Sequence, residues 1–352
     1  MAIQKPVINI ISHSIESNQV TGPRKVVENV CKGFEIIGQP YVLNRGITAY
    51  SWNWIHDSVE ALLEIAVLGK PAVIGPNIAI LPRDLPSCRP RLKDCIYLHP
   101  SQWVVDLWLQ LGFTECKLLP WPAGIDLASF NITRKSVKSD HVMVYFKERE
   151  PTLLDRVLEV LEESNLIPRL IVYGEYDEEQ YKRALSECSF GIWLGRQESQ
   201  GIALQEALSA DLPLVVIDAK SLFDTYALST YKFPAVLKSF RTTSAPYFDA
   251  RCGVIIADIE DLSRALYEIK DKLNSFSPRE FVEEELSLEV SAKKLMAIFS
   301  YLKIDAVEKV SNIAVERDFN LSFRAKILVD IFGLSILKKR LRRRVLRALK
   351  KS

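Results

Sequence analysis

The sequence lacks most of the short motifs that indicate a cofactor or metal site. Its six cysteines are scattered without a CxxC pair, and it contains only four histidines. It has no GxGxxG or GxxxxGK[ST] segment, so dinucleotide and P-loop sites find no support. It also has no DxD segment and no His/Cys/carboxylate cluster with metal-ligand spacing. We therefore predict no resident cofactor and no metal ion, and reduced core thiols typical of a cytosolic protein.

A hydrophobic run long enough to cross a membrane is also missing. The richest stretch, ILVDIFGLSIL at 327–337, is short and contains Asp330, whereas a membrane-spanning helix needs about 20 apolar residues. The first residues, MAIQKPVINIIS, pass straight into a strand pattern and lack the ordered segments of a signal peptide. We therefore expect a cytoplasmic protein.

The last fifteen residues contain no negatively charged side chain. Residues 338–352 hold nine Lys or Arg and no acid. The whole chain has a formal charge of only +2, so the other 337 residues carry −7. The near-neutral total therefore conceals a polarised molecule with a basic end.

Short β-branched runs alternate with longer segments of helical period, a pattern typical of parallel sheets covered by helices. The first half has strand-like runs at 7–12, 41–44, 72–75, 95–99 and 116–119, with helical segments at 22–37, 57–68 and 101–111. The second half has strand-like runs at 141–146, 169–174, 190–194, 212–218 and 253–258, with helical segments at 151–163, 178–186 and 201–210. The pattern predicts an α/β fold with two Rossmann-like domains.

The boundaries follow from composition. The polar stretch 131–140 predicts an interdomain linker, and Pro278 begins a long amphipathic helix through Tyr301. We predict an N-terminal domain at 1–135, a C-terminal domain at 136–280, a helix at 281–302 that returns toward the first domain, and a basic helical tail at 303–352. A chain of 352 residues is long enough for two cores.

Two loops that follow strands have the residues expected at a ligand site, because ligands of open parallel sheets bind beyond the carboxyl ends of the strands. In the first, Thr21 and Gly22 precede Pro23, so backbone amides at a helix start are available for an anion. An ordinary helix start explains the same residues. In the second, Gly201 opens a helix in which Glu206 has apolar neighbours. A carboxylate in that setting needs a partner, such as a ligand hydroxyl pair, although a solvated or dipole-stabilised helix residue is the alternative.

The second loop resembles the retaining GT-B glycosyltransferases of the large bacterial family with a Glu-x7-Glu motif, glycosyltransferase family 4-like. Glu198 and Glu206 are separated by seven residues, and the segment continues into Leu212–Val216. Weaker landmarks agree in order, and they are Thr21–Pro23, Pro100–Trp103 and Pro122–Asp126. The resemblance covers residues 7 to about 300 and implies two facing Rossmann-like domains, with the acceptor on the N-terminal side and the donor on the C-terminal side.

The resemblance also implies roles for individual residues. Glu206 would bind the ribose of a nucleotide-sugar donor, and Glu198 would contact the transferred sugar. Other donor-binding candidates are Gly22, Ser199, Gln200, Gly201 and Ile202. The family carries a basic pair after the first strand of the second domain to neutralise the diphosphate leaving group, and Lys147 and Arg149 are the candidates here. Their spacing departs from the family pattern, since the position five residues after Lys147 is Thr152.

The implied activity is a metal-independent, retaining sugar transfer to a saccharide or lipid-linked saccharide in polysaccharide or glycoconjugate synthesis. No general base can be assigned, because His13, His56, His99 and His141 do not match the family's histidine positions. His56 and His99 could border a cleft, but an ordinary histidine at the end of an element is the interpretation that we favour for each. Trp52, Trp54 and Trp121 fit either acceptor stacking or core packing.

Two other functions and three uses of the tail stay open at this stage. A sugar-nucleotide 2-epimerase and a non-catalytic scaffold can both have this two-domain fold. In the tail, a leucine and valine stripe with helical spacing lies among the basic residues of Leu334–Ser352. It predicts a cationic amphipathic helix on the inner face of an anionic membrane, with docking on the N-terminal domain and nucleic-acid binding as the alternatives. We expect the membrane surface, rather than nucleic acid, to be the partner.

Overall fold

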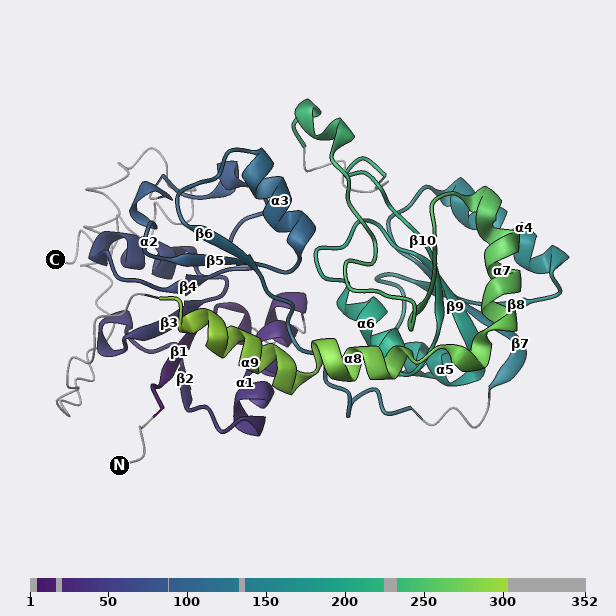
Figure 1. Ribbon diagram of the computed structural model, residues 1–352, viewed down its shortest axis with the longest axis horizontal. Helices are drawn as coiled ribbons and strands as arrows, with labels where there is room; N and C mark the ends of the chain where they lie inside the picture. Colours follow the sequence, from purple (N-terminus) through teal and green to yellow (C-terminus); the bar gives the residue numbers. More distant parts are fainter. Residues whose placement is uncertain (1–4, 17–20, 88, 133–136, 225–232, 303–352) are drawn as a thin grey trace.

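The computed structural model describes residues 5–16, 21–87, 89–132, 137–224 and 233–302. These residues form two α/β domains that lie side by side and are connected by the two last helices (Figure 1). Each domain has one sheet, and all neighbouring strands in both sheets are parallel. The predicted fold class, two Rossmann-like domains followed by C-terminal helices, is confirmed.

The first sheet has six strands in the order β2-β1-β3-β4-β5-β6 in the described part of the chain. The strands are β1 (Ile8–Ile11), β2 (Tyr41–Leu43), β3 (Trp52–Ile55), β4 (Val73–Ile74), β5 (Ile96–His99) and β6 (Lys117–Pro120). Successive residues point to opposite faces, so Ile96 and Leu98 pack in one core cluster and Tyr97 in another. Both faces of the sheet are therefore buried.

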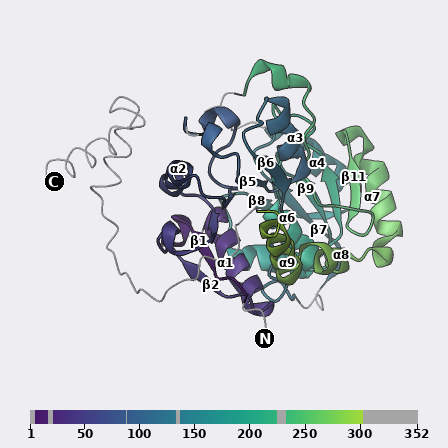
Figure 2. The ribbon, with the colours of Figure 1, turned by 60° about the vertical axis from the view of Figure 1, so that its left-hand side comes forward.

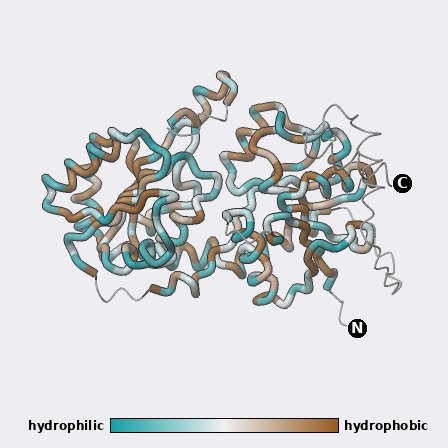
Figure 3. The backbone as a smooth tube through the Cα atoms, turned by 180° about the vertical axis from the view of Figure 1, so that it is seen from behind, coloured by the Kyte–Doolittle hydropathy of each residue, from teal (hydrophilic) through white to brown (hydrophobic). Residues whose placement is uncertain are grey.

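The second sheet has the order β11-β10-β9-β7-β8. Its strands are β7 (Lys138–Phe146), β8 (Ile167–Val172), β9 (Cys188–Leu194), β10 (Leu214–Ile217) and β11 (Gly253–Ile256). Its two faces contribute to separate core clusters in the same alternating way, with Met143 on one side and Val144 on the other. In Figure 3 the hydrophobic segments accordingly gather at the centre of each domain.

Helices cover both faces of each sheet. In the first domain they are α1 (Gly22–Ile36), α2 (Val59–Leu68) and α3 (Gln102–Gln110). In the second they are α4 (Pro151–Glu163), α5 (Glu178–Glu187), α6 (Ile202–Ser209) and α7 (Leu262–Asp271). Each strand-to-helix connection places its loop at the carboxyl end of the sheet, which is the edge where the two domains meet.

One strand is missing from the prediction, and one predicted boundary is wrong. The segment at 52–55 is the strand β3, between β1 and β4. It has only four residues, of which Ile55 alone is β-branched, so the usual strand signal is weak. The predicted linker at 131–140 ends in strand, because Lys138 already pairs with Cys188. Residues 138–140 are exposed, which explains their polar character.

The predicted long helix at 278–301 is also wrong, because it is two helices, α8 (Pro278–Leu286) and α9 (Leu288–Phe299). Ser287 ends the first helix in an extended conformation, and its side chain caps the second by accepting from the Val290 amide. The break frees the Leu286 carbonyl, which accepts a hydrogen bond of 2.8 Å from the Ile125 amide. The first domain is thereby tied to the junction between the two helices.

The last helix packs on the N-terminal domain. Figures 1 and 2 both show α9 beside α1, and Leu295 and Phe299 belong to the core cluster of the first sheet. The approach is close because glycine faces the start of α9. A Cβ atom at Gly33 would lie 2.6 Å from the Leu288 carbonyl oxygen, and one at Gly124 would lie 2.7 Å from the Leu288 Cα.

Several other expectations concern residues only partly covered by the structure. None of the five described cysteines forms a disulfide, and Cys88 lies outside the described residues. No helix within the described ranges is long and apolar enough to cross a membrane. The predicted amphipathic tail at Leu334–Ser352 lies entirely outside the described residues.

We predict that Gly124→Ala lowers the free energy of unfolding by about 1–3 kcal/mol, because the new methyl group overpacks against the α9 backbone. Gly46→Ala is the matched control, since a Cβ atom there meets nothing within 4 Å and the backbone φ is −56°. Urea denaturation of both variants measures the effect. Equal stability of the two variants would show that the α9 approach is not tight.

Candidate active site

A cleft of about 480 Å³ lies between the two domains. Its N-terminal side is formed by residues that follow β4 and β5, and its C-terminal side by the loop after β9. The polar and charged side chains that line it are Asn77, Asp84, His99, Arg196, Gln197, Glu198 and Ser199. The rest of the lining is largely apolar and includes Ile78, Ile80, Trp103, Leu107 and Phe233.

The loop after β9 is held by backbone contacts from both domains. The Glu198 amide donates to the Thr243 carbonyl at 3.0 Å, and the Glu198 carbonyl accepts from the Trp103 indole at 3.0 Å. The loop ends at Gly201, whose φ of +81° is the left-handed conformation that glycine adopts without strain. Gly201 is the N-cap of α6, and Ile202 is the first helical residue. The loop therefore presents the Glu198 side chain at a fixed place in the cleft.

Glu198 forms an ion pair with Lys147, the first residue after β7. The Lys147 Nζ lies 2.6 Å from a Glu198 carboxylate oxygen and 4.3 Å from the centre of the Tyr173 ring. Only 11% and 13% of the two side chains is exposed. The backbone of Lys147 continues the sheet, because its amide donates to the Leu194 carbonyl and its carbonyl accepts from the Arg196 amide, both at 3.0 Å. Two of the predicted site residues are thus in direct contact.

Glu206 lies on α6 and forms a second ion pair, with Lys25 of α1 in the other domain. Burial raises the pKa of the Glu206 carboxyl, and the charge of Lys25 opposes that rise. Aromatic groups surround the pair, since the Lys25 ammonium lies 5.6 Å from the centre of the Phe130 ring and the Tyr181 hydroxyl donates to the Ala203 carbonyl at 2.6 Å. The carboxylate predicted to need a partner has a lysine that the sequence analysis did not single out.

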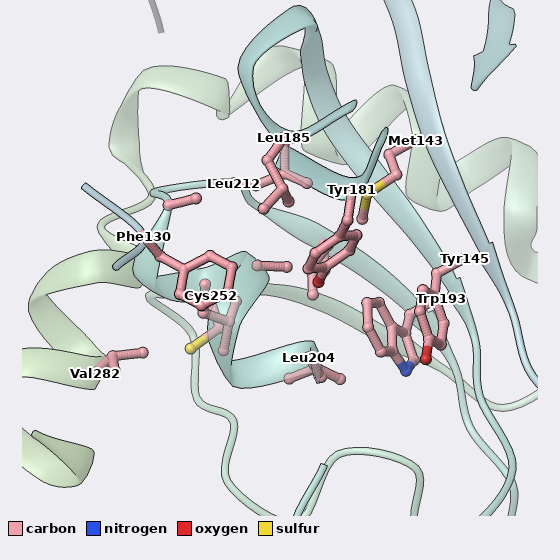
Figure 4. Close-up of a cluster of buried hydrophobic side chains, with 14 of the residues drawn as sticks. Phe130, Met143, Tyr145, Tyr181, Leu185, Trp193, Leu204, Leu212, Cys252 and Val282 are labelled. Atoms are coloured by element: carbon pink, nitrogen blue, oxygen red, sulfur yellow. The ribbon is translucent and has the colours of Figure 1, made fainter. Parts of the chain in front are cut away.

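Buried aromatic side chains pack against this part of α6. Figure 4 shows Phe130 on one side of Leu204 and Tyr145 and Trp193 on the other, with Tyr181 between them. The Tyr145 and Trp193 rings are stacked, with centroids 3.8 Å apart. These rings are almost fully buried. They therefore hold α6 at a fixed distance from the second sheet, which also sets the position of Glu206.

Gln200 joins the domains rather than pointing into the cleft. Its amide oxygen accepts from the Ala123 amide at 3.0 Å, and its amide nitrogen donates to the Ala123 carbonyl at 2.8 Å and to the Gln205 side-chain oxygen at 3.0 Å. Its side chain is buried. Of the other predicted donor-site residues, Ser199 lines the cleft, whereas Gly22 does not and is the first residue of α1, three positions before Lys25.

Arg149 is buried and bonded to main chain. One guanidinium nitrogen donates to the Gly195 carbonyl at 2.9 Å and to the Ile217 carbonyl at 3.0 Å. Burial lowers the pKa of this guanidinium. These contacts tie the ends of β9 and β10 together, so Lys147 is the stronger candidate for contact with an anionic ligand.

His56 and His99, the two histidines that could border the cleft, are neutral. Burial lowers the pKa of His56 to about 4 and that of His99 to about 3. His99 lines the cleft and packs against the Trp108 ring, with centroids 4.3 Å apart. A group with so low a pKa is too weak a base for efficient proton transfer near neutral pH. Among the described residues, no group of three His, Cys, Asp or Glu side chains could hold a metal ion.

The tryptophans divide between core and cleft. Trp54 and Trp121 are buried edge to face, with centroids 5.5 Å apart, and Trp52 stacks on Phe299. Core packing is thus the correct interpretation for these three. Trp103, which the sequence analysis used only as a landmark, lines the cleft instead. Trp103 and Arg196 both lie in segments that follow strands, and that position is the signal that would have identified them as cleft residues.

Comparison with known proteins identifies the fold. No known family model matches the chain, and no curated protein matches its sequence. Solved structures do match, and three of them each match over 84% of this chain and 99% of their own length. They are HepE from Anabaena in complex with UDP (11% identity, TM-score 0.53), HepE with UDP and glucose (11%, 0.50) and the apo form of the lipopolysaccharide outer core galactosyltransferase WaaB (12%, 0.50). The chain therefore has the two-domain GT-B fold of these glycosyltransferases.

Proposed function

We propose that this protein is a glycosyltransferase that moves a sugar from a nucleotide sugar to a saccharide or lipid-linked saccharide acceptor. The observation that carries the proposal is the placement of two buried carboxylates, Glu198 and Glu206, at the junction of two GT-B domains, each paired with a lysine. HepE was solved with UDP and with UDP and glucose, which makes UDP the first nucleotide to test. The fold alone would not carry this proposal, because one fold serves many functions.

The chemistry of a nucleotide sugar matches these side chains. Glu206 accepts hydrogen bonds from the ribose hydroxyls, and Glu198 accepts them from the hydroxyls of the transferred sugar. Amides at Gly201 and Ile202 begin α6 and attract negative charge through the helix dipole. Lys147 stabilises the diphosphate, whose charge grows as the bond between sugar and phosphate breaks.

We propose further that the transfer retains the anomeric configuration and needs no metal ion. The leaving phosphate accepts the proton of the acceptor hydroxyl on the same face, a route that requires no separate base. The low pKa of His99 favours this route, because the histidine that lines the cleft is too weak a base.

Transfer differs from 2-epimerisation in needing an acceptor beside Glu198. The cleft of about 480 Å³ extends from Glu198 across to the N-terminal domain, so an acceptor bound on that domain would lie next to the sugar that Glu198 contacts. Arg196, Gln197 and Ser199 line the cleft next to Glu198 in the chain, and apolar side chains such as Ile80 and Leu107 form other parts of its wall. This lining suits an acceptor that combines a saccharide with an apolar portion, as a lipid-linked saccharide does.

We predict that Glu206→Ala weakens donor binding by roughly 1.5–3 kcal/mol, because the ribose diol loses its charged acceptor. Calorimetry with UDP and UDP-sugars, extended to the ADP, CDP, GDP and TDP series, measures the loss. Glu268→Ala is the matched control, since that glutamate lies on α7, is 41% exposed and pairs with Lys272. Unchanged affinity in a folded Glu206→Ala variant would remove Glu206 from the donor site.

We predict that Lys147→Ala lowers kcat by about 100-fold, with a smaller change in donor affinity, because its charge matters most in the transition state. Steady-state kinetics and donor titration on the same preparation separate the two effects. Lys220→Ala, which removes an exposed lysine paired with Asp258, serves as the control. Wild-type turnover in the Lys147 variant would assign the diphosphate to another group.

We also propose that Leu334–Ser352 binds the inner face of an anionic membrane, where a lipid-linked acceptor would lie. Each basic residue near such a surface contributes about 1 kcal/mol. Deleting this segment is expected to abolish flotation with anionic vesicles at low salt while donor binding persists. Equal flotation of the full-length and shortened proteins, or of neither, would contradict the membrane role.

A further inference from the structure

We propose that Lys25 is a second diphosphate-binding cation, supplied to the donor site by the N-terminal domain. The inference rests on the proposed function, since it assigns Lys25 to the same nucleotide-sugar site. In this arrangement Lys25 exchanges its contact with Glu206 for a contact with the donor's phosphates. Donor binding then joins the two domains through one ligand.

The position of Lys25 is the first observation. It lies in the first turn of α1, and its ammonium reaches across the domain junction to the Glu206 carboxylate on α6. Its side chain is 36% exposed, whereas that of Glu206 is only 9% exposed. The lysine therefore enters from the open side of the junction and has a flexible stem of four carbons, so it can move while Glu206 stays in place.

The scarcity of other cations is the second observation. In the C-terminal domain, Arg149 donates to two main-chain carbonyls, and Thr152 is neutral. Lys182 pairs with Glu178 at 2.6 Å, and Arg196, which lines the cleft, pairs with Glu148 at 3.1 Å. The carboxylates of these two pairs are not among the proposed donor-binding residues, whereas Glu198 is, so Lys147 is the cation of this domain that a bound donor would release from its partner. A diphosphate carries more negative charge than one lysine neutralises.

The chemistry of exchange is the third observation. The junction holds two lysine–carboxylate pairs, Lys147 with Glu198 and Lys25 with Glu206. A nucleotide sugar carries a ribose diol, a diphosphate and sugar hydroxyls in sequence. Its hydroxyls satisfy both carboxylates and its phosphates satisfy both ammonium groups, so neither charge is left buried and unpaired when the ion pairs separate.

A purely blocking role for Lys25 makes a different prediction. If its ammonium only competed with ribose for Glu206, removing it would strengthen the binding of a nucleoside and of its diphosphate by the same factor. A purely structural role would weaken both by the same factor. Of the three roles, only a contact between Lys25 and phosphate changes the ratio of the diphosphate affinity to the nucleoside affinity.

The experiment measures that ratio by calorimetry with the full-length chain. The wild type is first titrated with ADP, CDP, GDP, TDP and UDP, and the tightest of them is compared with its own nucleoside. The same two ligands are then titrated into Lys25→Met, Lys25→Gln and Lys25→Arg. Lys32→Met is the matched control, because Lys32 is on the same helix and pairs with Asp126 at 2.6 Å.

We expect the preference for the diphosphate over the nucleoside to fall by about tenfold or more in Lys25→Met and Lys25→Gln, from the loss of one charge-assisted contact. Lys25→Arg and Lys32→Met should keep the wild-type preference. An unchanged preference in both neutral variants overturns the role of Lys25 and leaves the proposed function standing. Failure of all five diphosphates to bind the wild type overturns the proposed function and this inference with it.

Discussion

The burial of two carboxylates where the domains meet is the constraint on which the candidate site depends. A buried carboxylate costs free energy unless a cation or hydrogen-bond donors compensate it. Glu198 pairs with Lys147 of its own domain, so this ion pair requires only the C-terminal domain. Glu206 finds Lys25 in the other domain, so its compensation exists only while the domains lie together.

The junction that brings Lys25 to Glu206 is built largely from main-chain groups. Gln200 bonds to both polar backbone atoms of Ala123, and the Leu286 carbonyl accepts from the Ile125 amide. Backbone contacts of this kind depend on the path of the chain, which explains why Gly124 lies against the start of α9. A small change in that path would move α1, and with it the lysine that reaches Glu206.

The two sides of the cleft have different chemical character. Ion pairs and helix-start amides concentrate at the carboxyl end of the second sheet, where charge would develop during transfer. The N-terminal side contributes the apolar Trp103, Ile80 and Leu107, together with the polar groups of Asn77 and Asp84 and a neutral His99. This division fits a donor bound through charge on one domain and an acceptor bound through apolar contact and a few hydrogen bonds on the other.

The sequence by itself determined the alternation of strands and helices, the two-domain division, and the loop and following helix that carry Glu198 and Glu206. These features are local, because period, turn residues and short motifs reflect contacts between residues near one another in the chain. The same reasoning missed β3 and the break at Ser287. A four-residue aromatic strand gains its pairing from distant β1 and β4, and the break is stabilised partly by Ile125.

Tertiary structure alone decided the partners of the site residues. The sequence placed Lys147 and Arg149 together as candidates two residues apart, yet one pairs with Glu198 while the other is buried among carbonyls. It also gave no sign that Lys25 reaches Glu206, 181 residues away in the chain. Charge pairing across a domain junction depends on how two separately folded units pack, and no local pattern of residues encodes that geometry.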